Sequence, residues 1–183
     1  IMLNIAHMVT IKPQSGTHVA PIDLKLMEME QFARYTLEKE MLNRIRGKVP
    51  PEQEAVYRQL IEDYRQLEHE PSAERRETRM LDLDNAFHRR AFILCGMEEP
   101  FDHMLSTFQH TERLRKCSLQ TEENKSVCAA HTRILEAVLR GSEEDLSRAL
   151  GDHLNRYKLS VEQARQRHPE YFTEGTVHPV DHI

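Results

Sequence analysis

Three histidines and one aspartate are the side chains of this sequence whose types and spacing suit metal binding. Asp84 and His88 are four residues apart, so on a helix with 3.6 residues per turn they lie about 40° apart and share one face. His131 and His153 each have apolar residues three, four or seven positions away, which places both on the apolar stripe of a helix. We therefore expect the four side chains to point into the interior from three different helices.

A single divalent ion would explain why such polar groups point inward. A buried carboxylate must be paired, protonated or bound to a cation, because burial removes its hydration. Imidazole nitrogen combined with carboxylate oxygen favours Zn, Ni or Mn over Ca or Mg. The spacing also allows a second interpretation, in which each polar residue finds its own hydrogen-bond partner. The sequence has no H-E-x-x-H motif or cysteine-rich zinc pattern that would specify the metal.

The elements that must position these residues are predicted to be helices. The chain has only 6 Gly and 8 Pro, which favours long helices over a sheet with many turns. Glycines and prolines separate six stretches with helical apolar spacing, and Ser72 and Ser142 are suitable capping residues. We predict an all-α, antiparallel bundle of about six helices. The stretches are 23–46, 52–69, 72–95, 100–118, 122–140 and 142–168.

The two ends of the chain differ from this pattern. Alternating, β-branched residues on both sides of Pro13-Gln14-Ser15-Gly16 predict a short β-hairpin over roughly 8–20. An isolated hairpin is only marginally stable in water, so it should belong to a neighbouring domain or pack on the helices. Residues 170–183 have no helical period and are predicted to be a tail.

Composition excludes several other classes of protein. The 183 residues are 39% hydrophobic, which is enough for a core, yet no run approaches the roughly 20 apolar residues of a membrane span. The three cysteines are scattered, and no signal segment opens the chain, so we expect a reduced, cytoplasmic protein. Residues 1–22 hold one charged residue, Lys12, and all 30 Asp and Glu follow them. A body this acidic is a poor ligand for nucleic-acid phosphate.

Several motifs together give the sequence a family resemblance. Residues 84–88 (DNAFH) resemble the D-x-x-F-H motif of the FCD domain, the all-helical effector-binding domain of FadR-type GntR transcription regulators. Residues 131–137 (HTRILEA) are similar to the E-H-x-x-I-L-x-A-I stretch of that family, and residues 9–19 resemble the wing of its winged helix-turn-helix. Further matches are Gly141-Ser142 followed by His153-Leu154, and Arg34 with Glu38 in the R-x-x-x-E of the first helix.

The resemblance implies a domain division and a set of partners. Residues 1–22 would be the remnant of a winged helix-turn-helix with its linker, and 23–169 an FCD-like domain. The sequence contains no recognition helix, so operator DNA would be bound by an N-terminal domain that it lacks. Regulators of this family resemble two-fold readers of palindromic sites, which implies a homodimer. No membrane partner is expected.

In this family the metal generally receives a small organic acid, which implies a carboxylate effector for this chain. Arginines would then bind the other end of the acid through their forked guanidinium groups. Arg34 matches the family position, Arg115 shares the core-facing stripe of Phe108, and Arg113 is a second choice. Gly151 lies inside a predicted helix two residues before His153, where it either makes room for a ligand or helix or is simply tolerated.

The sequence departs from the family pattern at a few positions and leaves other functions open. Ala130 stands where the family usually has Glu, and Ser142 where it has Asp, which leaves the identity of the effector open. One alternative is a metal-dependent enzyme of the hydrolase type, which would need a general base near the metal. Another is a bundle with a purely structural metal. Only a metal-dependent acid sensor also accounts for the wing-like hairpin, so we predict a regulatory, non-enzymatic function.

Overall fold

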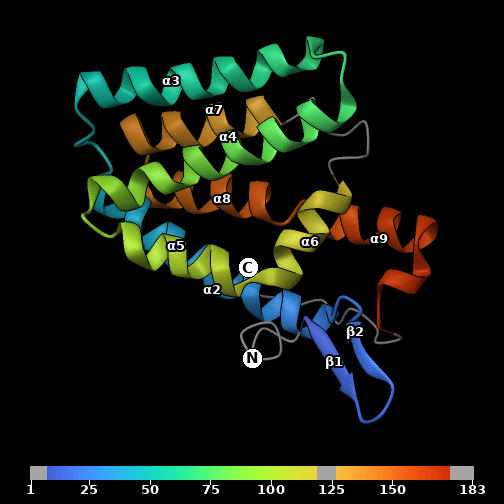
Figure 1. Ribbon diagram of the computed structural model, residues 1–183. Helices are drawn as coiled ribbons and strands as arrows, with labels where there is room; N and C mark the ends of the chain where they lie inside the picture. The colour runs from blue at the N-terminus through green and yellow to red at the C-terminus, as the bar shows by residue number, and fades with distance from the viewer. Residues whose placement is uncertain (1–7, 119–126, 174–183) are drawn as a thin grey trace.

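The computed structural model describes residues 8–118 and 127–173 and shows a helical bundle preceded by a small β-hairpin (Figure 1). This confirms the predicted all-α class. No helix in these ranges is long and apolar enough to span a lipid bilayer. The helices are α2 (Leu24–Ile45), α3 (Pro51–Gln66), α4 (Ala73–Leu94), α5 (Glu98–Thr107), α6 (Gln109–Ser118), α7 (Val127–Arg140), α8 (Glu143–Leu154) and α9 (Tyr157–Arg167), with 3-10 turns at Leu67–His69 and Pro169–Tyr171.

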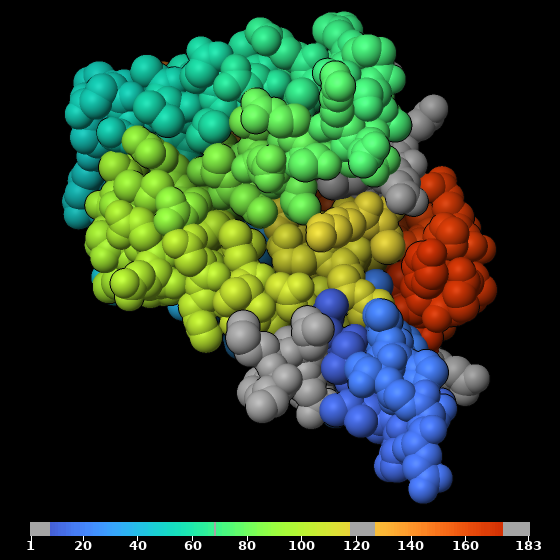
Figure 2. Space-filling view, viewed as in Figure 1, coloured from blue at the N-terminus to red at the C-terminus, as the bar shows by residue number. Residues whose placement is uncertain are grey.

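The long helices form one body, and a smaller group of elements packs at its end. α3 lies along α4 and α7, and α8 packs against both α7 and α2. α6 contacts α2, α4 and α5 on one side and α9 on the other, so it lies between the two groups (Figures 1 and 2). The main core joins apolar residues of α2, α3, α4, α5, α7 and α8. The second core joins α9, the start of α2 and Leu114 of α6.

Side-chain caps explain where three of the helices begin. Asp23 accepts hydrogen bonds from the backbone N–H groups of Lys25 and Leu26 at the start of α2. Ser72 caps α4, as its position after Pro71 predicts. Ser142 and Asp145 form the predicted capping box, in which each side chain accepts from the other residue's backbone N–H, and α8 follows directly.

The predicted helix over 100–118 is instead two helices, because the backbone turns at Phe108 (φ −81°, ψ 60°). The hydroxyl groups of Ser106 and Thr107 donate to the carbonyl oxygen of His103. Such local bonds compete with the regular helical ladder and favour its end. The break matters for function because it turns α6 away from α5 and toward α2 and α9.

The predicted helix over 142–168 is also two helices, which meet at Asn155 and Arg156. The N–H of Arg156 bonds the carbonyl of His153, three residues back, and the turn is tighter than in an α-helix. The apolar residues of α8 lie in the main core, whereas those of α9 lie in the second core. A single straight helix could not bury both sets. The predicted start of α7 at 122–126 lies outside the described residues.

The hairpin is present where the sequence predicts it. β1 (Val9–Lys12) pairs antiparallel with β2 (Gly16–Val19), with Val9 opposite Val19, and both strands are largely exposed. It projects from the bundle below α6 in the view of Figure 1. The chain then enters the body, because Ile22 is buried in the second core.

The first residues of the expected tail also differ from the prediction. Ile22 and Phe172 form a parallel bridge, in which Ile22 N–H donates to the carbonyl of Tyr171 at 2.6 Å. Phe172 is buried in the second core, so residues 170–173 belong to the packed body. Residues 174–183 lie outside the described part of the chain.

Candidate metal centre

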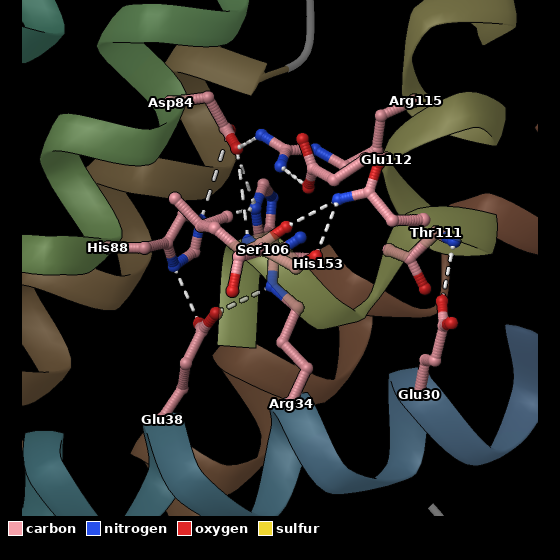
Figure 3. Close-up of polar contacts among 12 residues, drawn as sticks. Glu30, Arg34, Glu38, Asp84, His88, Ser106, Thr111, Glu112, Arg115 and His153 are labelled. Atoms are coloured by element: carbon pink, nitrogen blue, oxygen red, sulfur yellow. Dashed lines mark hydrogen bonds and ion pairs between the residues drawn. The ribbon is translucent and has the colours of Figure 1, made fainter. Parts of the chain in front are cut away.

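The structure brings the four predicted metal ligands together. Asp84 and His88 come from α4, His131 from α7 and His153 from α8. One ligand-type atom from each side chain lies within 4.8 Å of all the others. Figure 3 shows Asp84, His88 and His153 pointing toward one another. The helical spacing in the sequence therefore placed all four on inward faces that converge.

The convergent atoms are one carboxylate oxygen and three imidazole nitrogens. Asp84 Oδ1 is 3.1 Å from His131 Nε2 and 3.9 Å from the Nε2 atoms of both His88 and His153. The Nε2 atoms of His88 and His153 are 3.0 Å apart. Ligand atoms that each lie about 2 Å from one ion are at most about 4 Å from one another. These separations are already in that range.

Protein partners leave polar atoms of this cluster unsatisfied. Within the described residues, His131 Nε2 and His153 Nδ1 are buried and accept or donate no hydrogen bond. Buried polar atoms without a partner are rare, and each one needs an explanation. A cation among the Nε2 atoms would use the lone pair of His131. It would also give the two facing nitrogens of His88 and His153 a common partner. The residues present therefore fit a divalent metal.

The protonation states favour metal binding as well. Burial lowers the pKa of His131, and burial with the charges of His131 and His88 holds the pKa of His153 well below its ordinary value. Both imidazoles are therefore neutral near pH 7 and keep a lone pair. Burial alone would raise the pKa of Asp84, but Arg115, His88 and His131 hold it well below the usual range. Asp84 is therefore a carboxylate.

Two buried residues of α2 support His88 from behind. Glu38 Oε2 lies 2.6 Å from His88 Nδ1, and Arg34 Nε donates to Glu38 Oε1 at 2.6 Å (Figure 3). Burial raises the pKa of Glu38, but the charges of Arg34 and His88 lower it to about 2, so this group is ionised. An ionised Glu38 holds the proton on Nδ1 of His88 and leaves the Nε2 lone pair free to face the centre.

The opposite side of the centre is formed by α6. Arg115 Nη2 donates to Asp84 Oδ2 at 2.5 Å, and its Nη1 donates to Glu112 on the same helix. Arg34 Nη2 lies 3.9 Å from the same Asp84 oxygen. The two arginines predicted to bind an acid therefore both reach the centre. In this structure they are held by carboxylates of the chain itself.

Aromatic rings hold the His131 imidazole in place. Phe87 stacks on it with ring centroids 4.1 Å apart and planes only 7° from parallel. Tyr64 meets the same ring edge-on at 5.9 Å. Phe87 is itself buried in the main core and meets Tyr57 at 5.1 Å. The imidazole therefore has little freedom to rotate.

Arg113 is not part of this centre. Its Nη1 donates to the carbonyl oxygen of Ala20 at 2.7 Å, near the end of β2. Arg113 and Arg115 are two residues apart and so about 200° apart around a helix, which prevents both from facing the centre. The sequence analysis assigns no role to Glu38 or Glu112. The spacing Arg34-x-x-x-Glu38 and Glu112-x-x-Arg115 on single helices was the signal that each acid accompanies an arginine.

Comparison with known proteins identifies the fold. The family model of the FCD domain matches residues 31–156, which is more than half of the chain and includes every residue of the centre. A search of curated proteins found no match to this chain.

Proposed function

This chain belongs to the FCD domain family, the effector-binding domains of GntR-type transcription regulators, and we propose that it senses a small organic acid through a divalent transition metal. The ion would be Zn, Ni or Mn, bound by the four residues that converge between α4, α7 and α8. In the full regulator, acid binding would modulate contact with operator DNA. When bound, the ion supplies a positive charge and coordination positions that a carboxylate can complete.

One observation carries the proposal: four ligand-type atoms from three helices meet in the interior, and His131 Nε2 is left there without a hydrogen bond. A set of separate polar residues, each with its own partner, does not explain this arrangement. Zinc is bound in proteins by imidazole and carboxylate ligands of this kind. Three imidazoles with one carboxylate also leave room for a further ligand when the ion is five- or six-coordinate.

The charges around the centre favour an anionic effector. The carboxylates of Asp84, Glu38 and Glu112 face the guanidinium groups of Arg34 and Arg115, which leaves one net negative charge. A divalent ion changes this sum to one net positive charge. A small carboxylate would neutralise it and could replace a carboxylate of the chain at either arginine.

Zinc titration tests the metal part of this proposal. We expect wild-type protein, stripped of metal by chelation, to bind one equivalent of Zn²⁺ by calorimetry. His131→Ala should weaken binding at least tenfold, because it removes one ligand and the support of Phe87 has no imidazole to hold. His168→Ala is the matched control, since His168 is exposed and pairs only with its neighbours Glu170 and Tyr171. Equal affinities for wild type and His131→Ala would refute the ligand set.

Acid binding tests the effector part separately. Zinc-loaded protein is titrated with acetate, succinate and citrate, and we expect Arg34→Ala to lose affinity for whichever acid binds while still binding one Zn²⁺. Arg34→Lys keeps the charge without the fork and should show an intermediate loss. Unchanged affinity in Arg34→Ala would remove the arginine from the site. If metal-free protein bound the acid equally well, the ion would be structural and not part of the sensor.

A further inference from the structure

We propose that α6 couples the metal centre to the β-hairpin, through Arg115 and Glu112 on one face and Arg113 and His110 on the opposite face. This inference rests on the proposed function and names the element that carries its signal. It assigns a regulatory role to Arg113, which lies away from the metal ligands. The segment that receives the signal is the linker of residues 20–23, which joins β2 to α2.

The two faces of α6 follow from helical geometry. At about 100° per residue, His110 and Arg113 lie within about 60° of each other, and so do Glu112 and Arg115. The mean directions of the two pairs differ by about 160°. A helix of ten residues therefore presents one pair to the centre and the other pair to the linker.

The linker face makes two direct hydrogen bonds to the chain between hairpin and bundle. Arg113 Nη1 donates to the carbonyl of Ala20 at 2.7 Å, and the backbone N–H of Asp23 donates to His110 Nδ1 at 3.0 Å. Asp23 is also the cap of α2, so the same residue links α6 to the start of the first long helix.

A carboxylate holds the beginning of α6 on α2. Glu30 Oε2 accepts from the backbone N–H of Thr111 at 2.7 Å, and Glu30 Oε1 accepts from that of His110 at 3.4 Å (Figure 3). The N-terminal turn of α6 is therefore fixed to α2, whereas its C-terminal half carries Arg115. A force on Arg115 would pivot the helix about this fixed turn.

Metal binding would apply such a force. Arg115 donates to Asp84 Oδ2 at 2.5 Å, while Oδ1 of the same carboxylate faces the imidazoles. A divalent ion bound at Oδ1 would share this carboxylate with the guanidinium, and the two like charges repel each other strongly in a buried site. The site and the linker would then have two linked arrangements of α6, whose balance shifts only by the difference in affinity for the ion.

Amide hydrogen exchange of the whole 183-residue chain tests the coupling, with Zn²⁺ alone as the probe. In wild type, we expect Zn²⁺ to slow exchange in α4 and α7 around the ligands. We also expect it to change exchange at the Asp23 amide and within 9–20 by about fivefold or more, the lower end of usual allosteric coupling. In Arg113→Gln, the change at the ligands should remain and the change at 9–23 should fall below twofold.

The control is Arg148→Gln, which removes the same charge from an exposed arginine of α8 that bonds only its helical neighbours. It should behave as wild type. If Zn²⁺ slows exchange around the ligands but leaves 9–23 unchanged in wild type, the coupling is wrong and the metal site stands. The coupling is equally wrong if Arg113→Gln keeps the full change. If Zn²⁺ alters exchange nowhere, the proposed function fails and the coupling fails with it.

Discussion

At the scale of the residue, the centre depends on groups that are not ligands. Glu38 is 1% exposed and lies between Arg34 and His88. A carboxylate buried this deeply is stable only because both neighbours compensate its charge. In return it fixes which nitrogen of His88 carries the proton. The metal site is therefore built on a chain of buried ionic contacts that begins on α2.

Glu38→Gln tests this supporting role. The amide keeps the size of the side chain but loses the charge, so it holds the Nδ1 proton of His88 less strongly. We expect Zn²⁺ affinity to fall 10- to 100-fold in calorimetry, the usual cost of removing such a partner. Glu136→Gln is the matched control on α7, where the exposed Glu136 pairs with Arg58. If both variants bind Zn²⁺ as wild type does, Glu38 has no role in the site.

The sequence predicts the residues of the centre only as far as helical periodicity reaches. A 3.6-residue period places the four ligands on inward faces, and the structure confirms that they converge. It does not rank Arg113 against Arg115, because the start of α6 depends on the break at Phe108. Glu112 carries no signal of its own, since an acid three residues before an arginine is common on exposed helices.

At the scale of the element, the predicted helices are correct where caps mark their ends and wrong where packing sets them. Ser72 and Ser142 are caps that can be read from the residues alone. The breaks at Phe108 and at Asn155–Arg156 are needed because α6 and α9 bury their apolar residues in a second core. Nothing in the local sequence shows that two cores exist.

Gly151 and Gly141 give opposite predictions at this scale. A Cβ at Gly151 would lie 3.8 Å from Tyr35 Cε2, an ordinary contact, so the helix can accept a methyl group there. We expect Gly151→Ala to raise the free energy of unfolding by about 0.5–1 kcal/mol, because alanine loses less backbone entropy on folding. Urea denaturation measures the change. A destabilised Gly151→Ala would show that the helix needs the space after all.

Gly141→Ala is the contrasting variant at the junction of α7 and α8. Its Cβ would lie 2.8 Å from both the Cα and the carbonyl oxygen of Ala137, which are backbone atoms that cannot move aside. We expect a loss of about 1–3 kcal/mol in the free energy of unfolding. Stability equal to that of wild type would contradict the packing described at this junction.

At the scale of the whole molecule, the bundle and the hairpin are one connected structure. Ile22 and Phe172 join the chain before the bundle to the chain after it, and both are buried in the second core. α6 lies between this second core and the metal centre. A change in the centre can therefore reach the hairpin within one protein body.

The family also leads us to expect a homodimer, because two-fold DNA sites are bound by two-fold symmetric regulators. Sedimentation at tens of micromolar should give a mass twice the 21.5 kDa of one chain. The acidic body should not bind DNA tightly by itself, since its net charge repels phosphate. A monomer across that concentration range would contradict the expectation.

Elemental analysis tests the central claim most directly. The protein is purified without metal-affinity resin from cells grown with trace metals, and its bound transition metal is counted per chain. We predict close to one equivalent of Zn, Ni or Mn in wild type and in His168→Ala, and a loss in His131→Ala and His153→Ala. Metal absent from wild type, together with no rise in unfolding temperature when Zn²⁺ is added, would contradict the account.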